Sequence, residues 1–198
     1  MTSVALFSGL LFPEIQPGTV HEIAGDQSIV SFAALLLGRT RDTPVCWVGS
    51  SVDLYPPGLA GLALDPGRLV LAEAEREEDR LALLETALAG GLHAAGPVDR
   101  LSRLAVRRLA LAARRGQALG LVLNVGKASD SNAFATRWQI GAAPSGPDGT
   151  RRWRVELLHA RGVPPGAFGL ELGHDGATHA FDLAGGRTAR AQSFRRAG

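Results

Sequence analysis

Lysine is nearly absent from this chain. Of the 21 Lys and Arg residues among 198, Lys127 is the single lysine and the others are arginines. Alternating α/β proteins that bind nucleotides through a P-loop need a lysine at the loop that follows their first strand. Lys127 lies far along the chain from that loop, so the composition argues against P-loop phosphate chemistry.

Cysteine and long apolar runs are scarce as well. Cys46 is the one cysteine and lies in an apolar run, which excludes an internal disulfide framework and predicts a buried structural thiol. Residues 4–12 are apolar but lack the basic start of a signal peptide. Residues 27–38 are uncharged but fall short of the roughly 20 residues that a membrane span needs. These features predict a soluble, cytoplasmic protein.

The remaining composition is that of a folded domain. Apolar residues make up 45% and charged residues 20%, which excludes intrinsic disorder. The 25 glycines and 11 prolines follow no repeat, which excludes collagen and solenoid folds. We expect a single domain over residues 1–184, with its core at about 13–172, and an Arg-rich, mobile tail over 185–198.

Short apolar runs alternate with helical patterns over the first two thirds of the chain. This alternation predicts an α/β fold, with a mainly parallel twisted sheet flanked by helices. The predicted strands cover residues 18–25, 45–48, 69–71, 92–95 and 119–125, and the predicted helices cover 28–37, 76–89 and 101–115. Three further strands without intervening helices, at 135–142, 152–160 and 167–172, predict antiparallel hairpins that extend the sheet.

The loop after the first predicted strand is where a P-loop would bind phosphate. That motif reads G-x-x-x-x-G-K-[ST]. Gly25 stands at its first glycine, but Val30 replaces the second glycine, Ser31 the lysine and Phe32 the hydroxyl residue. Asp26, which we expect to cap the helix, adds a negative charge where phosphate would lie. The loop is therefore a degenerate P-loop, and we predict no bound cofactor and no enzymatic activity.

Other catalytic patterns are missing from the sequence. The five histidines show no zinc-ligand spacing, and no G-x-S-x-G nucleophile elbow is present. We therefore predict neither a metal site nor a catalytic residue.

Four stretches carry a family resemblance. They are residues 18–25 (GTVHEIAG), residues 53–69 (DLYPPGLAGLALDPGRL), residues 107–113 (RRLALAA), and residues 135–138 (ATRW) with 152–162 (RWRVELLHARG). In this order they resemble the ImuA family, the RecA-like accessory factors of bacterial damage-induced mutagenesis. The likeness covers about residues 13–172. Pro97 departs from the pattern, because many members have an acidic residue after the fourth strand.

The resemblance implies a RecA-like fold and a role in DNA damage repair. ImuA-type proteins act in SOS-induced error-prone translesion synthesis with ImuB, an inactive Y-family polymerase homologue, and with an error-prone replicative-type polymerase. RecA-like domains also self-associate, so the resemblance allows a homo-oligomer. Two alternatives stay open: a SulA-like cell-division inhibitor that binds the tubulin-like division protein, and a residual nucleotide hydrolase.

Arginines gather on the predicted helix over 101–115. Arg100, Arg103 and Arg107 form a stripe with Arg114, and guanidinium groups in a line suit contacts with DNA phosphates. The alternative is a solvated face, or pairing with the acidic helix before it. The apolar stripe is predicted to hold Leu101, Leu104, Ala105, Leu109 and Ala112. Arg108 projects into that stripe and predicts a buried ion pair or a snorkelling side chain.

Two further segments are candidates for binding DNA or a partner. In RecA-like proteins the loops after the fourth and fifth strands face DNA, and here the second of these carries Lys127, Ser129 and Asn132. Arg137 follows on a predicted strand, where we expect Trp138 to point into the core and Arg137 away from it. The tail carries Arg190, Arg195 and Arg196, which form either a binding arm or a solvated terminus.

Overall fold

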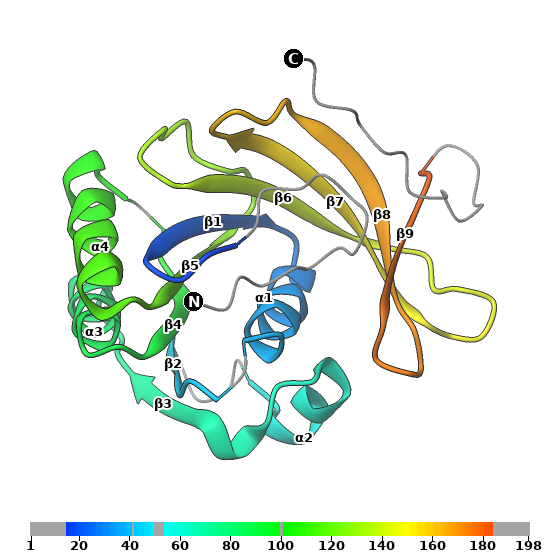
Figure 1. Ribbon diagram of the computed structural model, residues 1–198, viewed down its shortest axis with the longest axis horizontal. Coiled ribbons are helices and arrows are strands. Elements are labelled where there is room, and N and C mark those ends of the chain that lie inside the picture. The colour runs from blue at the N-terminus through cyan, green and yellow to red at the C-terminus, as the bar shows by residue number, and fades with distance from the viewer. Residues whose placement is uncertain (1–14, 41, 50–53, 100, 184–198) are drawn as a thin grey trace.

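A computed structural model describes residues 15–40, 42–49, 54–99 and 101–183 of the chain. In these ranges one nine-stranded sheet has the order β3-β2-β4-β5-β1-β6-β7-β8-β9 (Figure 1). The strands are β1 (Thr19–Gly25), β2 (Val45–Gly49), β3 (Leu69–Glu73), β4 (His93–Pro97), β5 (Leu119–Val125), β6 (Thr136–Ala143), β7 (Arg151–Ala160), β8 (Gly166–Leu172) and β9 (Thr178–Phe181). The helices are α1 (Ser28–Gly38), the short α2 (Pro56–Leu59), α3 (Glu77–Ala89) and α4 (Arg103–Gly116), with 3-10 turns at Ala60–Leu62 and Pro66–Arg68.

The predicted parallel sheet with antiparallel C-terminal strands is confirmed, with one difference. β6 pairs antiparallel with β7, as expected for a hairpin, but it enters the sheet parallel to β1. In this register His21 lies opposite Thr136. A buried chain of hydrogen bonds fixes that pairing: Trp138 Nε1 donates to Thr136 Oγ1 over 2.5 Å, and Thr136 Oγ1 lies 2.7 Å from His21 Nδ1.

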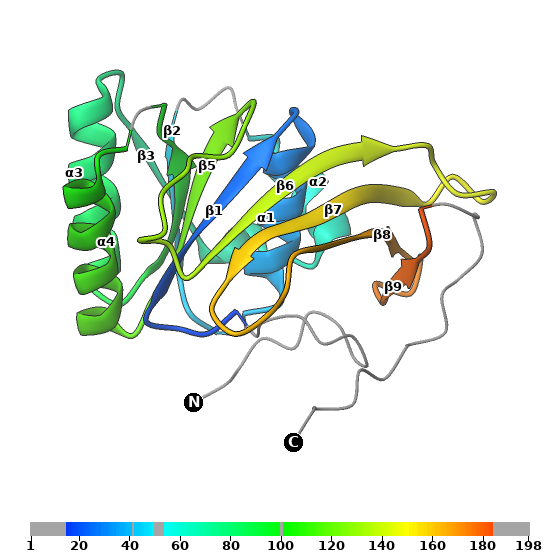
Figure 2. The ribbon, with the colours of Figure 1, turned by 90° about the horizontal axis from the view of Figure 1, so that it is seen from above.

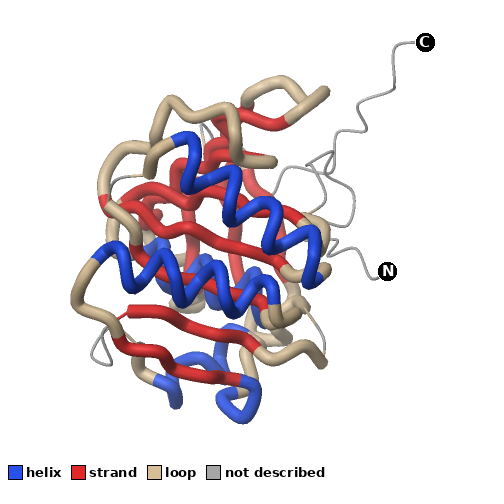
Figure 3. Tube along the Cα trace, turned by 90° about the vertical axis from the view of Figure 1, so that its left-hand side faces the viewer, coloured by secondary structure: helices blue, strands red, loops and turns tan. Residues whose placement is uncertain are grey.

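Two separate apolar cores lie on the two faces of the parallel strands. Helices α1 and α2 cover one face, and α3 and α4 lie side by side over the other (Figures 2 and 3). The α1 core is the larger, because β6, β7 and β8 turn their own apolar side chains toward the same helix. Trp138 and Trp153 are both buried there, which confirms the core positions predicted for these two strands.

Helix α4 begins where a side chain caps it. Ser102 Oγ accepts a hydrogen bond from the Ala105 amide over 3.1 Å, which satisfies one of the free amides at the helix start. At its other end Gly116 packs directly on α3, since a Cβ there would lie 1.9 Å from the Leu88 carbonyl oxygen. The close approach of the two helices therefore depends on a glycine at this position.

The predicted apolar stripe of α4 is partly wrong. The helix buries Val106, Leu109, Ala112 and Ala113, whereas Leu104 is 68% exposed. Val106 and Ala113 are seven residues apart and therefore lie on the same side of the helix. This side, with its smaller side chains, faces the sheet. Arg108 is consequently exposed and forms a 2.6 Å ion pair with Glu85 of α3.

No helix within the described ranges combines the length and the apolar character that a bilayer crossing requires. The Arg-rich segment 185–198 lies outside the described residues.

Candidate functional site

The link between β1 and α1 is too short to wrap around a phosphate. Only Asp26 and Gln27 separate Gly25, the end of the strand, from Ser28, the start of the helix. Gly25 has φ 147°, and a Cβ on it would lie 1.8 Å from the carbonyl oxygen of Ile140. The link is thus pressed against β6, and the glycine serves this close approach rather than an open phosphate loop.

The carboxylate of Asp26 lies at the start of α1, where a phosphate would lie in a P-loop protein. Its Oδ1 accepts the Ser28 amide over 2.8 Å, and its Oδ2 accepts the Ala142 amide of β6 over 2.9 Å. Hydrogen bonds from Ser28, together with the Ala142 amide, hold the pKa of this carboxyl below its usual value. The expected helix cap is wrong in detail, because Gln27 is the N-cap residue. The carboxylate nevertheless supplies the negative charge that a bound phosphate would bring.

The positions that would hold the P-loop lysine and hydroxyl are used for packing. Ser31 Oγ accepts a 3.2 Å hydrogen bond from Trp153 Nε1 on β7. Phe32 is 2% exposed and meets the Trp153 ring edge-on, with ring centroids 6.2 Å apart and an interplanar angle of 67°. Val30 packs against the same core. The three residues that depart from the motif, Val30, Ser31 and Phe32, therefore each help to hold α1 against the sheet.

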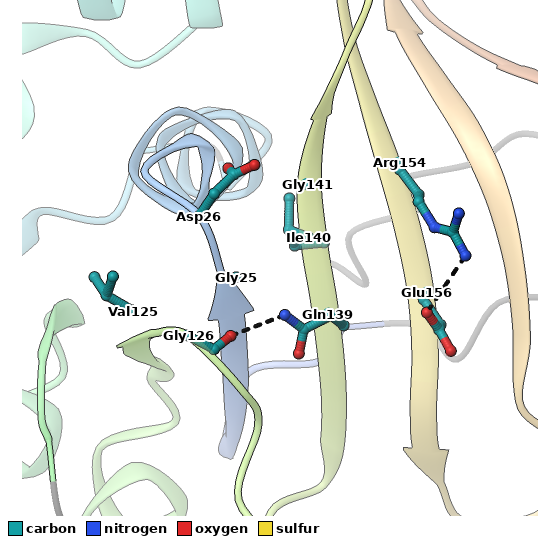
Figure 4. Close-up of a pocket in the computed structure, with 9 residues that line it drawn as sticks. All are labelled: Gly25, Asp26, Val125, Gly126, Gln139, Ile140, Gly141, Arg154 and Glu156. Atoms are coloured by element: carbon teal, nitrogen blue, oxygen red, sulfur yellow. Dashed lines mark hydrogen bonds and ion pairs between the residues drawn. The ribbon is translucent and has the colours of Figure 1, made fainter.

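An open pocket of about 460 Å³ remains at this end of the sheet (Figure 4). Its described lining includes Asp26, Gln139, Arg154 and Glu156, and contains no lysine. Gln139 Nε2 donates to the Gly126 carbonyl over 2.8 Å, and Arg154 lies 3.9 Å from Glu156 (Figure 4). The polar groups of the pocket are thus engaged with one another, and Asp26 would repel a nucleotide phosphate.

The loop between β5 and β6 is fastened to the sheet by a buried acid. Glu22 of β1 is 1% exposed, and its two oxygens accept the Ser129 amide and the Ser129 hydroxyl, each over 2.9 Å. Arg137 donates a hydrogen bond to the Ser129 carbonyl. Ser129 and Arg137, both predicted as DNA or partner contacts, are therefore committed to holding the loop. The sequence reasoning missed Glu22, although a lone acid within an apolar central strand marks such a role.

The loop brings Asn132 to the start of α4. Arg103, Arg107, Asn132 and Ala133 line a hollow of about 420 Å³. Within the described part of the chain neither guanidinium forms an ion pair. Arg103, the first residue of α4, is unfavourable for the helix dipole by about 0.3–1 kcal/mol. Two unpaired arginines with an amide side chain make this hollow suited to an anion such as a phosphate.

The other candidates lie apart from this hollow. Lys127 is exposed near the carboxyl end of β5, and its carbonyl accepts a hydrogen bond from Asn124. Arg100 and the tail residues Arg190, Arg195 and Arg196 lie outside the described residues. The structure therefore brings together three of the predicted residues: Arg103, Arg107 and Asn132.

Two histidines of the parallel strands, His21 of β1 and His93 of β4, are buried and neutral. Burial lowers the pKa of His21 to about 3, and burial together with the charge of Arg68 lowers that of His93 to about 4. His93 Nδ1 accepts the Leu119 amide over 3.0 Å, a bond that needs the neutral ring. Among the described residues no three His, Cys, Asp or Glu side chains gather as a metal site would require.

Known proteins resemble this chain over most of its length. No protein-family model matches the chain. It is 36% identical over 197 aligned residues to the protein named "Protein ImuA" in two strains of Caulobacter vibrioides, NA1000 / CB15N and ATCC 19089 / CIP 103742 / CB 15. The alignment covers 84% of this chain and 80% of each relative.

Proposed function

This chain belongs to the ImuA family, and from that premise we propose that it is a non-catalytic, RecA-like adaptor of SOS-induced, error-prone translesion DNA synthesis. In this role it binds an ImuB-type Y-family polymerase homologue in the cytoplasm and works beside an error-prone replicative-type polymerase. The sheet supports the RecA-like part of the proposal, because a parallel core continues into antiparallel strands at its C-terminal side.

The single observation that carries the adaptor role is the closed link between β1 and α1. Asp26 accepts the Ser28 amide, which at this helix start would face a phosphate, and Phe32 is packed on Trp153 where a magnesium-binding hydroxyl would stand. A fold that binds nucleotide at this end would need these groups free. These groups are instead engaged in contacts within the protein, which favours a binding role over nucleotide hydrolysis.

DNA is the second ligand that we propose, and it contacts the hollow at the start of α4. Arg103 and Arg107 present guanidinium groups without ion-pair partners among the described residues, and Asn132 adds an amide. Such groups bind phosphate oxygens without reading the base sequence. The ImuA relationship favours this proposal over the SulA-like division inhibitor.

Binding experiments test the proposal directly. The purified chain should bind a purified ImuB-type protein and not the tubulin-like division protein, measured by calorimetry with both partners at the same concentrations. Capture of the division protein alone would contradict the adaptor role. Titration with Mg-ATP in the same instrument should give no heat of binding, and a micromolar affinity would contradict the conclusion drawn from Asp26 and Phe32.

A further inference from the structure

Helix α4 carries two exposed leucines on the side that faces away from the protein. Leu104 is 68% exposed and Leu111 is 67% exposed. Residues seven apart lie about 20° from each other around a helix, so both leucines belong to one line along α4. This line is roughly opposite to the buried residues Val106 and Ala113. The helix therefore has an apolar line at the centre of its solvent side.

Arginines flank this line on both sides. Arg107 and Arg114 lie along one flank, and Arg108 and Arg115 along the other, by the helix repeat. Only Arg108 forms an ion pair with another described residue, Glu85. The helix itself contains no acidic residue. The outer face of α4, which we define as Leu104, Leu111 and these four arginines, is thus apolar at its centre and positively charged at its edges.

We propose that the outer face of α4 binds an acidic amphipathic helix of a partner protein. The two leucines bury apolar side chains of that helix, and the flanking arginines pair with its carboxylates. Charge complementarity selects this occupant, because α4 is cationic along its length and offers no carboxylate of its own. The inference rests on the proposed function, since the partner there is the ImuB-type protein.

A nucleic acid fits this face less well than a protein. A phosphate backbone offers no apolar surface, so Leu104 and Leu111 would gain nothing from it. The hollow at the start of α4 has arginines and an amide without leucines, which suits phosphate. Arg115 lies two turns beyond Arg107, about 12 Å further along the helix. The two surfaces share Arg107, but Leu104 and Leu111 belong to the outer face alone. Substitution of the leucines therefore tests the outer face separately from the hollow.

The edge strand β3 is the competing place for a partner. It lies at one end of the sheet, and Val70 and Leu71 are about half exposed there. A partner strand could pair with this edge through backbone hydrogen bonds. The edge carries no charge pattern that would choose a partner, and Leu71→Thr keeps a residue that strands favour. This variant therefore separates the two surfaces in one experiment.

The test measures the affinity of a purified ImuB-type protein for three chains: the wild type, Leu104→Ser/Leu111→Ser, and Leu71→Thr. Both leucines are more than two thirds exposed, so the double variant keeps the urea midpoint of the wild type. We expect it to bind the ImuB-type protein at least tenfold more weakly and to bind a 30-nucleotide single strand as tightly as before. The Leu71→Thr chain should bind both ligands like the wild type.

Each other outcome overturns the inference in a recognisable way. Unchanged partner affinity in the double leucine variant, or a loss confined to Leu71→Thr, removes the partner from α4. Lost DNA affinity with intact partner binding makes the face a nucleic-acid contact. Leucine-dependent binding to phosphatidylglycerol vesicles, but not to the protein, makes it a lipid contact. If the wild-type chain does not bind the ImuB-type protein, the proposed function itself fails, and this assignment with it.

A cross-link locates the partner independently. Cys46 is the chain's one cysteine and is buried, so a maleimide reagent reacts at an engineered exposed site. Leu104→Cys carrying a benzophenone maleimide should cross-link to the ImuB-type protein on illumination. Asp175→Cys, in the exposed turn before β9, is the matched control and should not. Equal cross-linking from both positions, or none from Leu104→Cys, would contradict docking on α4.

Discussion

Replacing Phe32 by threonine restores the hydroxyl residue of the P-loop motif. The substitution tests whether Phe32 stabilises the fold at this position. Phe32 is 2% exposed and contacts Trp153 edge-on. Truncating a buried phenylalanine costs about 3–5 kcal/mol, part of which is the aromatic pair at about 0.5–1.5 kcal/mol. A threonine keeps one methyl group, and its hydroxyl can reach the Ser28 carbonyl one turn back. We therefore expect Phe32→Thr to destabilise the protein by about 3 kcal/mol.

Urea unfolding followed by circular dichroism measures this loss. For a slope of about 2 kcal/mol/M, the midpoint falls by about 1.5 M, and in a thermal melt Tm falls by about 6–12 °C. Phe32→Leu is the control, because it stays apolar and should lose less than half as much. Calorimetry with Mg-ATP should remain flat for every variant. A loss below about 1 kcal/mol, or micromolar nucleotide binding by Phe32→Thr, would refute the reasoning.

Three further predictions concern the loop, the hollow and the buried histidines. Arg103→Ala/Arg107→Ala should weaken binding to a single strand and lower the slope of log K against log salt by about 1.4, measured by fluorescence anisotropy; an unchanged slope would assign both side chains to a solvated face. Glu22→Ala should speed hydrogen exchange at the Ser129 amide, with Glu22→Gln as the matched variant, and equal exchange in the wild type and Glu22→Ala would contradict the loop anchor. The lowered pKa values of His21 and His93, about 3 and about 4, mean that the unfolded chain takes up protons first as pH falls below about 6.5. The free energy of unfolding should therefore decrease from pH 6.5 to 4, by up to about 3 kcal/mol for His93; His93→Gln should flatten the profile, and a flat profile in the wild type would contradict neutral burial.

The sequence predicted the three long helices and the first eight strands because apolar periodicity marks them, whereas the four-residue α2 has no such pattern. Residues 119–125, for example, read LGLVLNV, an apolar run broken only by Asn124, and the strand has those same bounds. Strand β9 was missed, because Thr178–Phe181 is four residues long and has only one buried side chain at Phe181. The parallel entry of β6 was also missed, since His21 and Thr136 are 115 residues apart and their hydrogen bond has no local signal.

The candidate site could be predicted in part from residue type and position. Arg103 and Arg107 were predicted as part of a helix stripe and Asn132 from a separate loop, and the three lie together because a helix start and a loop after a neighbouring strand share one edge of the fold. Ser129 and Arg137 were predicted on the same grounds, but Ser129 bonds Glu22 and Arg137 bonds Ser129. The amino-acid composition does not show that Glu22 is buried. Helical spacing alone could not orient α4, since leucines occupy both its sides.

The closed link at Gly25 also has a consequence for nucleotide binding. The carbonyl of Ile140 requires a glycine there, so this glycine can be kept for packing whether or not a phosphate binds. Nucleotide binding at this link would need a longer link, removal of Asp26 and replacement of Ser31 and Phe32, and the last of these changes removes the packing of Phe32 on Trp153. Each of these changes alone would remove a contact that stabilises the fold. Single substitutions at this link are therefore expected to leave the chain without nucleotide binding.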